Sequence, residues 1–470
     1  MSPEPHAGPR RFVFITPVWG DAYTDRFVKL SLPSQLSGGN LGAVPSDAAA
    51  YLIYTRRKHA RAIARSAAYR RLKDLVPTSI RLLDDLPEPG VGGDHHALMT
   101  AAYTRGIASA GGDDACVFLT PDLLASDGSF HNLVRLARAG KRVVLVLGIR
   151  MTAVGATTCV ARHAVGGSAV AAIPPRALVR ACLDNLHPIS TGHVVARGRV
   201  LAPQHFYWRV GDHGLLARGF HIHPLMVWPR NPTAAIRNTL DDEYIADACP
   251  DRSEWHTVTD SDEICVTEFS EARHKLDMLA AQPFSDEKVL RFMANDTTPS
   301  HRLHVLKRIC FHTGGLDAPA WDETAARSDR LVDGYIAAFQ EAFPDGPEVT
   351  PDGVVAIRNR LAAVLGRQKT DGGGESVPLR RLLLLGCAAP FWVVYRLVHH
   401  KLYRYLDRLN SEAIELRNLI METREWLDTA RRDLDLLRAE VAALPGKPVE
   451  PPAMPRRRSK QKDADVRRPR

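Results

Sequence analysis

Residues 115–133 read ACVFLTPDLLASDGSFHNL, an order that predicts a strand, a turn and a helix. The uncharged run 115–119 is typical of a buried strand. Thr120-Pro121-Asp122 then breaks the run, and Asp127-Gly128-Ser129-Phe130 opens a helix predicted to reach residue 139. A helical stretch, 95–110, precedes the strand. We therefore expect one helix on either side of a central strand.

The same alternation of strand and helix extends over the first 147 residues. Short apolar runs predict strands at 12–18, 51–54, 79–83, 115–119 and 142–147, with helices at 58–75, 95–110 and 128–139. Alternation at this spacing predicts an α/β fold built on a mainly parallel sheet. Because the strands are almost continuously apolar, flanking helices should cover both faces of the sheet.

After residue 147 the sequence no longer alternates regularly between predicted strands and helices. Residues 151–229 suggest shorter strands and turns, and the acidic stretch 241–264 suggests a loop. Residues 271–343 look helical, with one apolar face made by Trp321, Leu331, Tyr335, Ala338 and Phe339. The glycine-rich segment 371–375 predicts a flexible linker, which ends a helical extension over 271–370.

Charge and cysteine content narrow the class of protein. The chain has 470 residues and a formal net charge of +9. Residues 456–470 carry eight Lys and Arg against two Asp, so most of that charge lies in a basic tail, 445–470, expected to be disordered. This distribution argues against a folded nucleic-acid reader. Seven cysteines without a CxxC pair, and a polar N-terminus (1–10) without an apolar signal segment, favour a cytoplasmic protein.

Two C-terminal segments predict contact with a membrane and self-association of the chain. The uncharged run 382–395 is flanked by Arg380, Arg381 and Arg396, and it is shorter than the roughly 20 residues that a membrane span needs. We expect 379–401 to be a membrane-interfacial segment on the inner face of the membrane, with a core helix or an oligomer interface as the alternative. Over 402–444, apolar residues recur at spacings of four and three, which predicts a coiled coil and self-association. A single amphipathic helix docked on the body is the alternative there.

The turn after the first strand excludes one common class of site. Residues 19–23 read WGDAY, without the glycine-rich GxGxxG pattern. A dinucleotide or S-adenosylmethionine site usually places glycines there, so that backbone amides can approach phosphate. The sequence therefore argues against NAD-linked chemistry.

The segment around the central strand resembles a known family. Residues 105–110 (RGIASA), 116–119 (CVFL) and 120–122 (TPD), followed by a helix at Gly128-Ser129, are similar to the central part of GT-A-fold, family 2-like glycosyltransferases. The resemblance extends loosely over residues 11–270. It implies transfer of a sugar from a nucleotide diphosphate-sugar, with an acidic D-x-D element after the strand.

The resemblance also implies a metal site. A carboxylate at the end of the strand would hold Mn²⁺ or Mg²⁺ against the diphosphate, and a downstream histidine would complete the site. Asp122 stands at the position of the carboxylate. His223, which ends the sequence Phe220-His221-Ile222-His223, stands at the position of the histidine. Thr120 replaces the first Asp of D-x-D, which leaves open a metal-independent or inactive member. Helix or turn capping by Asp122 and a structural role for the histidine are the alternatives.

The resemblance also implies nucleotide contacts, because residues 12–19 and 51–56 stand where the family's first two nucleotide-facing strands lie. The expected nucleotide contacts are Thr16, Pro17, Trp19, Thr55, Arg56, Asp85 and His96. Turn formation explains Asp85 equally well, and basic residues are common at strand ends. A general base for the acceptor hydroxyl would be a carboxylate, and Asp241 and Asp242 are the candidates, with the acidic run 260–263 as a second group.

Together these features predict a sugar transferase that acts at the cytoplasmic surface of the membrane. The acceptor would be a glycan or a lipid-linked acceptor, and envelope or capsule polysaccharide synthesis fits the predicted layout. One alternative is a catalytically inactive GT-A-like domain in an oligomeric, membrane-associated scaffold. Another is a nucleotidyltransferase, which would also use a metal-linked acid but would release pyrophosphate.

Overall fold

The computed structural model describes residues 8–87, 95–167, 169–195, 200, 202–237, 240–274 and 285–344. The chain divides into one unit of residues 1–378 and a second of 379–470, and everything described belongs to the first. The predicted interfacial segment, coiled coil and basic tail lie outside the described residues. So do the linker at 371–375 and the predicted N-terminal tail, apart from residues 8–10.

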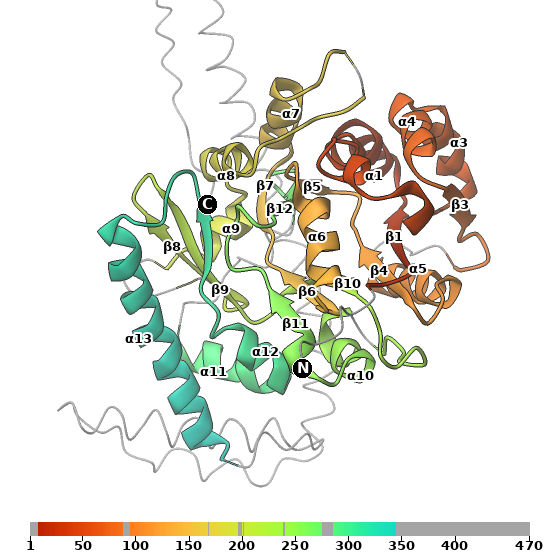
Figure 1. Ribbon diagram of the computed structural model, residues 1–470. Coiled ribbons are helices and arrows are strands. Elements are labelled where there is room, and N and C mark those ends of the chain that lie inside the picture. The colour runs from red at the N-terminus through yellow and green to blue at the C-terminus, as the bar shows by residue number, and fades with distance from the viewer. Residues whose placement is uncertain are drawn as a thin grey trace, which may run out of the picture. The chain divides into compact units, whose positions relative to one another are not determined.

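A seven-stranded mixed sheet forms the centre of the described unit (Figure 1). Its strand order is β11-β6-β10-β4-β1-β2-β3. The strands are β1 (Arg11–Val18), β2 (Ala49–Thr55), β3 (Thr78–Leu82), β4 (Asp114–Phe118), β6 (Val143–Val146), β10 (His223–Val227) and β11 (Trp255–Thr257). All pairs are parallel except those that β10 makes with β4 and β6. The predicted α/β class is confirmed.

Both faces of this sheet are buried, as the apolar strands predicted. On β1, Val13 and Ile15 belong to one core, whereas Phe12 and Phe14 belong to another. β4 divides in the same way, with Cys116 and Phe118 in the first core and Val117 in the second. Since neighbouring residues on a strand point to opposite faces, each strand contributes to a core on either side.

The predicted helices around the sheet are present, with one difference. α5 (His95–Ser109) and α6 (Ser129–Arg138) match the predicted ranges closely. The predicted helix 58–75 is instead two helices, α3 (Arg57–Arg65) and α4 (Ala67–Leu75). Ser66 separates them because its backbone is extended (ψ 148°), and its hydroxyl caps α4 by accepting from the amide of Tyr69 at 3.1 Å.

The middle of the chain contains more helix than its sequence suggested. Three helices lie in 151–229, and they are α7 (Ala153–Arg162), α8 (Pro175–Asp184) and α9 (Pro188–Gly192). The acidic stretch 241–264, predicted to be a loop, contains three short helical segments and strand β11. The other helical segments of the first 254 residues are α1 (Asp21–Arg26), η1 (Phe27–Ser31), α2 (Leu32–Gln35), η2 (Leu41–Ala43), η3 (Ser46–Ala48), η4 (Leu240–Tyr244), α10 (Ile245–Ala248) and η5 (Arg252–Glu254).

Two small sheets complete the unit. The first has the order β5-β12-β7, from β5 (Leu123–Ala125), β12 (Val266–Ser270) and β7 (Ile149–Thr152). The second has the order β13-β9-β8, from β13 (Ile309–His312), β9 (Gly214–Gly219) and β8 (His205–Val210). The helices α11 (Asp286–Asn295), α12 (Pro299–His304) and α13 (Pro319–Ala342) follow β12 along the chain and pack on the second small sheet.

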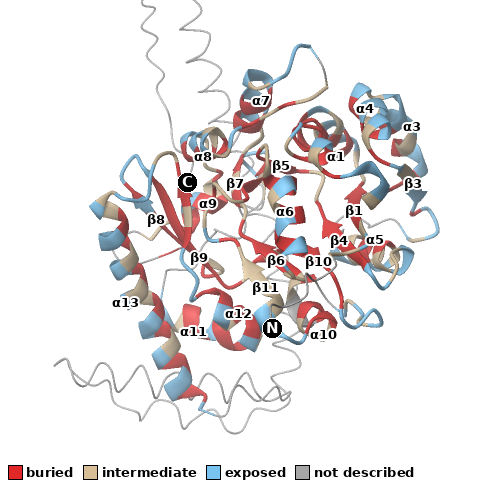
Figure 2. Ribbon diagram, in the orientation of Figure 1, coloured by how far each residue is buried: buried red, intermediate tan, exposed pale blue. Residues whose placement is uncertain are grey.

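Helix α13 carries the apolar face that its sequence predicted. Trp321, Tyr335, Ala338 and Phe339 are buried in a third core with β8 and β9, and Leu331 packs against it. Figure 2 shows the buried side of the helix as a stripe facing β8. Among the residues that the structure describes, no helix is both long and apolar enough to cross a membrane.

Candidate functional site

The order of strands identifies one edge of the large sheet as the place to look for a site. β1 lies between β2 and β4, so the chain adds β2 and β3 on one side of β1 and β4 on the other. In open α/β sheets, ligands bind beyond the carboxyl ends of the strands at such a reversal. Here Trp19 and Gly20 follow β1, and Thr120, Pro121 and Asp122 follow β4.

A buried histidine fixes the turn after β1. Gly20 has a φ of 81°, in the left-handed region that glycine adopts without strain. Its amide donates to Nε2 of His59 at 2.9 Å, so Nδ1 of His59 carries the ring proton and points at the Asp21 carboxylate, 3.2 Å away. His59 is only 3% exposed. The turn is therefore held in one conformation from the side of α3.

The turn after β4 brings Asp122 into a charged cluster that the first small sheet builds. Asp122 directly precedes β5, Glu268 lies on β12 and Arg150 lies on β7. In the register of this sheet, Glu268 is opposite Leu123 on one side and Arg150 on the other. Arg150 forms an ion pair with Glu268, and its Nη1 lies 3.6 Å from Oδ2 of Asp122. One cation thus faces two carboxylates.

Burial and charge act against each other in this cluster. Burial raises the pKa of Asp122, and Arg150 opposes that rise, while the negative charge of Glu268 adds to it. Burial lowers the pKa of Arg150, but the two carboxylates outweigh it and raise that pKa on balance. Nη1 of Arg150 is buried without a hydrogen-bond partner. The site therefore holds a charged N–H group that no described residue accepts from.

Helix α1 adds further groups to the same site. Burial raises the pKa of Tyr23, and the negative charge of Asp122 raises it further, so this phenol stays protonated at neutral pH. Arg26, three residues later and so on the same face of the helix, binds Glu271 just after β12, with an N–O distance of 2.6 Å. A phenol and two guanidinium groups thus border the carboxyl ends of β1 and β4. Such donors suit a phosphorylated ligand.

The residues predicted to hold a metal do not form a ligand set. His223 opens β10, and its Nε2 donates to the carbonyl of Phe118 at 2.8 Å. In the described part of the chain, two groups of three side chains could each hold a metal ion, and neither includes Asp122 or His223. Asp122 faces Arg150 instead, and the hydroxyl of Thr120 offers no charge. The two predicted ligands do not fit Mn²⁺ or Mg²⁺ in this arrangement.

Four of the predicted nucleotide contacts lie within or directly after β1 and β2. Thr16 is fully buried, and its hydroxyl bonds that of Tyr51 at 2.7 Å inside the core. Pro17 and Thr55 are also buried, whereas Trp19 is partly exposed at the end of β1. Of these, Trp19 has the position most accessible to a ligand at the sheet edge.

Of the other three predicted contacts, one binds the loop after β3 and two lie at the surface. Arg56 is 5% exposed, and its guanidinium donates to the carbonyls of Leu83, Leu86 and Pro87, each at 2.6 Å. Asp85 pairs with Arg105, which lowers the pKa of that carboxyl. His96 lies exposed in the first turn of α5. Arg56 thus shapes the loop beside the predicted nucleotide position, and direct contact of these residues with a nucleotide stays a prediction.

The predicted catalytic residue Asp241 belongs to a different group. Its Oδ2 lies 3.1 Å from Nδ1 of His221, and its backbone carbonyl accepts from Nε2 of His301 at 2.6 Å. Neither of these two contacts involves Asp122. The side chain of Asp242 lies outside the described residues. Their role as a general base stays a prediction.

Sequence reasoning missed Arg150, Glu268 and Tyr23. A usable signal existed for the first two, because each is the sole charged residue of a short strand, IRMT and VTEFS respectively. Charged side chains in otherwise uncharged strands usually face a partner or a ligand. Which partner they face depends on the pairing of strands far apart in sequence, and the local pattern does not contain that information.

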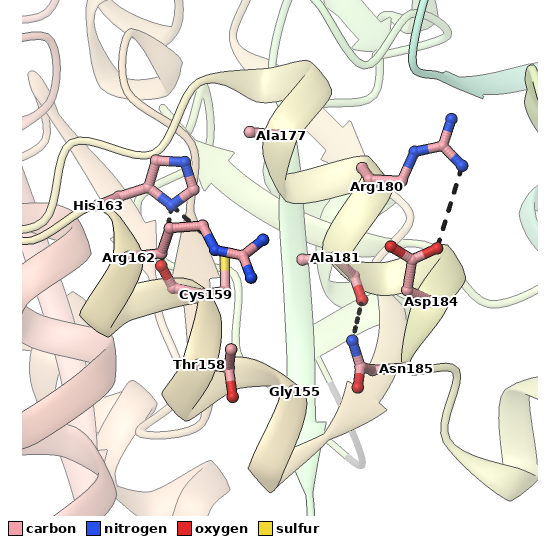
Figure 3. Close-up of a pocket in the computed structure, with 10 residues that line it drawn as sticks. All are labelled: Gly155, Thr158, Cys159, Arg162, His163, Ala177, Arg180, Ala181, Asp184 and Asn185. Carbon is pink, nitrogen blue, oxygen red and sulfur yellow. Dashed lines mark hydrogen bonds and ion pairs between the residues drawn. The ribbon is translucent and has the colours of Figure 1, made fainter. Parts of the chain in front are cut away.

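A cavity of about 230 Å³ lies elsewhere, between α7 and α8 (Figure 3). Cys159, Arg162, His163, Arg180 and Asp184 are among its lining residues. Arg180 turns toward Asp184 at 4.0 Å, so part of its charge is neutralised internally. Pockets for small ligands usually measure roughly 300–1,000 Å³. This cavity is smaller than that and contains none of the site residues above.

Comparisons with known proteins give no family. No family model and no curated protein matches the sequence. A structure from Bacillus anthracis, assigned as a glucose-1-phosphate thymidylyltransferase in complex with a sucrose, matches with a TM-score of 0.20 and 14% identity over 30% of this chain and 55% of that one. TarS from S. aureus matches with a TM-score of 0.28 and 9% identity over 79% of this chain and 50% of that one.

The chain spans about half the length of each of these solved structures, 55% and 50% respectively. The two matches are a nucleotidyltransferase and a glycosyltransferase, which is a distant likeness of fold. At these TM-scores the likeness has no bearing on activity. The proposals below rest on the side chains of this chain.

Proposed function

We propose that this protein transfers a sugar from a nucleotide diphosphate-sugar, and that the cluster of Asp122, Arg150 and Glu268 faces the diphosphate. One observation carries the proposal. A buried carboxylate and a guanidinium with an unpartnered N–H lie just beyond the carboxyl end of β4, beside the reversal of strand order. That is the place where an α/β sheet of this kind binds its ligand.

The chemistry of the proposed reaction needs positive charge at the diphosphate. The bond between the sugar C1 and the phosphate oxygen breaks, and its electron pair leaves with the nucleoside diphosphate. Arg150 meets that developing negative charge, and Arg26 adds a second guanidinium nearby. Charged donors already in position at a leaving group are among the larger contributions to catalysis. In this proposal the guanidinium takes the part that a divalent cation would otherwise play.

The acceptor side of the reaction needs a base. The acceptor hydroxyl oxygen forms the new bond to C1, and its proton passes to a carboxylate. Glu268 is the more exposed of the two carboxylates on Arg150, with 36% of its side chain exposed against 13% for Asp122. We assign the proton to Glu268, and Asp241 is the alternative base. Asp122 then serves to position Arg150.

The finer features of the function rest on the sequence alone. An acceptor at the cytoplasmic membrane surface is consistent with the apolar run at 382–395 and its flanking arginines. Self-association is consistent with the heptad pattern at 402–444. A glycan or a lipid-linked acceptor, as in polysaccharide synthesis, would suit a transferase held in this way.

The test is thermal melting of the full chain with UDP, GDP, CMP or ADP, with and without Mn²⁺. A ligand at ten times its Kd adds about 1.4 kcal/mol to stability, which is a Tm rise of only about 2 °C for a protein of this size. We expect one nucleotide to raise Tm without Mn²⁺, and Arg150→Gln to abolish the rise. Arg291→Gln, which removes an exposed guanidinium from α11, is the matched control.

Two results would count against the proposal. A rise in Tm that requires Mn²⁺ would restore a metal at Asp122 and remove the assigned role of Arg150. No rise with any nucleotide, from a protein that melts cooperatively, would favour the inactive, oligomeric scaffold.

A further inference from the structure

A second group of charged side chains lies where two sheets meet. Asp260 and Asp262 follow β11 of the large sheet, and His312 ends β13 of a small one. Asp260 is bridged in parallel to Cys310, so the two chains run side by side here. Asp260 begins a tight turn in which the amide of Glu263 donates to its carbonyl at 3.1 Å and the amide of Asp262 donates to its Oδ1 at 2.8 Å. This turn brings the carboxylates of Asp260 and Asp262 to the ring of His312. None of these residues belongs to the Asp122 site.

The ligand atoms of this group lie close together. Nε2 of His312 is 2.8 Å from Oδ1 of Asp260 and 3.8 Å from Oδ2 of Asp262. With zinc bonds of about 2.0–2.2 Å, two ligands of a tetrahedral ion are about 3.3 Å apart. The measured separations lie on either side of that value, so small side-chain movements would place all three atoms around one ion.

Hydrogen bonding fixes the orientation of the His312 ring. Its Nδ1 faces the carbonyl of Gly314, which can only accept, so Nδ1 must carry a proton. In the neutral ring, Nε2 is then a bare lone pair directed at two carboxylates. An arrangement in which one ring nitrogen donates to a carbonyl while the other binds the ion is usual for metal-bound histidine. The ring is held firmly, since His312 is 2% exposed.

The negative charge of the two carboxylates favours a cation at this place. Two carboxylates face the lone pair, and the only cation that an ion pair brings to them in the described part of the chain, besides the ring of His312 itself, is Arg176, 2.8 Å from Oδ2 of Asp262. A carboxylate oxygen and a bare ring nitrogen repel each other at 2.8 Å. Either a second proton or a metal ion must lie between them. The partly exposed carboxylates leave room for a water as the fourth ligand.

We propose that Asp260, Asp262 and His312, with a water as the fourth ligand, bind a Zn²⁺ that links β13 to the segment after β11. An imidazole with two carboxylates is a ligand set that zinc accepts in four-coordinate sites. The other group of possible ligands, His221, Asp241 and His301, suits it less. Both ring nitrogens of His301 are already hydrogen-bonded within the protein. Nδ1 accepts from the amide of Thr298, and Nε2 donates to the backbone carbonyl of Asp241.

The experiment is calorimetric titration of the metal-stripped full chain with Zn²⁺, together with its Tm. We expect the wild type to bind Zn²⁺ and gain Tm, and His312→Gln and Asp260→Asn to lose at least about tenfold in affinity. Asp260 is the safer variant, because 44% of its side chain is exposed and Asn keeps its shape. Asp241→Asn is the matched control and should bind Zn²⁺ as the wild type does.

A fourth variant separates a metal site from a purely structural ion pair. Arg176→Gln removes the guanidinium that competes for Asp262, so it should tighten Zn²⁺ binding. The proposal is overturned if Asp260→Asn and His312→Gln bind Zn²⁺ like the wild type. It is equally overturned if Asp241→Asn is the variant that loses the ion, since the metal would then belong to the other group.

Discussion

Nη1 of Arg150 lies 3.6 Å from Oδ2 of Asp122, beyond hydrogen-bonding distance, and it is buried with no acceptor among the described residues. An arginine N–H without a partner inside a protein is unfavourable, and an incoming phosphate oxygen would satisfy it. The same guanidinium also keeps Asp122 and Glu268 from repelling each other. Ligand binding and folding should therefore both depend on this one side chain.

Removing the guanidinium should destabilise the protein. Arg150→Met keeps much of the side-chain volume but leaves the buried Asp122 carboxylate without its cation, which should cost about 3 kcal/mol. Urea unfolding measures the change. The double variant Arg150→Met with Asp122→Asn should recover part of the loss, because it removes the stranded charge. If the double variant is no more stable than the single one, the two residues are not coupled.

The ion pair between Arg218 and Asp329 of α13 should also stabilise the fold, because it neutralises a buried charge. Arg218, on β9, is only 2% exposed and pairs with Asp329 of α13. Asp329→Ala leaves this buried cation unpaired, so we expect a loss of about 3–5 kcal/mol in the free energy of unfolding. Arg308 binds the same carboxylate from the surface, with 53% of its side chain exposed. Arg308→Ala should therefore change stability by less than about 1 kcal/mol.

Stability should fall in mild acid because a buried histidine stays neutral. Burial, with the nearby His301, lowers the pKa of His304 from 6.5 to about 4. As pH falls below 6.5, the unfolded chain takes up the proton first, so stability is lost between those two values. At pH 5 this one group should remove about 2 kcal/mol. Urea unfolding at pH 7 and pH 5 tests it, since His304→Gln should show a smaller loss than wild type. Equal losses would contradict the lowered pKa.

Because α5 packs closely on β1, replacing Gly106 by a residue with a side chain should lower the free energy of unfolding. A Cβ atom there would lie 2.6 Å from Cδ1 of Ile15, in the middle of the sheet. Gly106→Ala should destabilise the protein by about 1–3 kcal/mol, although alanine favours helix. Gly334 of α13 is the control, because a Cβ there meets nothing within 4 Å. Gly334→Ala should stabilise by about 1 kcal/mol, the difference in helix propensity alone. Both free energies come from chemical denaturation.

Local patterns predicted the large sheet well and the charged sites poorly. The apolar runs that became β1, β2 and β4 each carry their own signal, and the helices between them follow from spacing. Asp122 was found because the turn after a predicted strand, Thr120-Pro121-Asp122, resembles a D-x-D element. Its neighbours Arg150 and Glu268 come from strands that pair only in the folded chain. No window of sequence contains that pairing.

The histidines illustrate the same limit. His221 and His223 suggested one metal-binding face of a strand, but β10 begins only at His223. The two rings therefore have separate partners, Asp241 for the first and the carbonyl of Phe118 for the second. His312 carried no such suggestion, because its carboxylate partners lie about 50 residues earlier in the chain, 52 for Asp260. Burial and register decide which polar residues meet, and both are properties of the fold.

The measurement that tests the central proposal most directly is the release of nucleoside diphosphate from a panel of nucleotide-sugars by the full-length protein, with no added metal. Water serves as the acceptor if no natural acceptor is present. We predict release from one nucleotide-sugar, at least about 100-fold slower in Arg150→Gln and unchanged in Arg291→Gln, in keeping with the loss of one preorganised charge at a leaving group. Release that is equally fast in Arg150→Gln, or no release from any nucleotide-sugar by the folded wild type, would contradict the account.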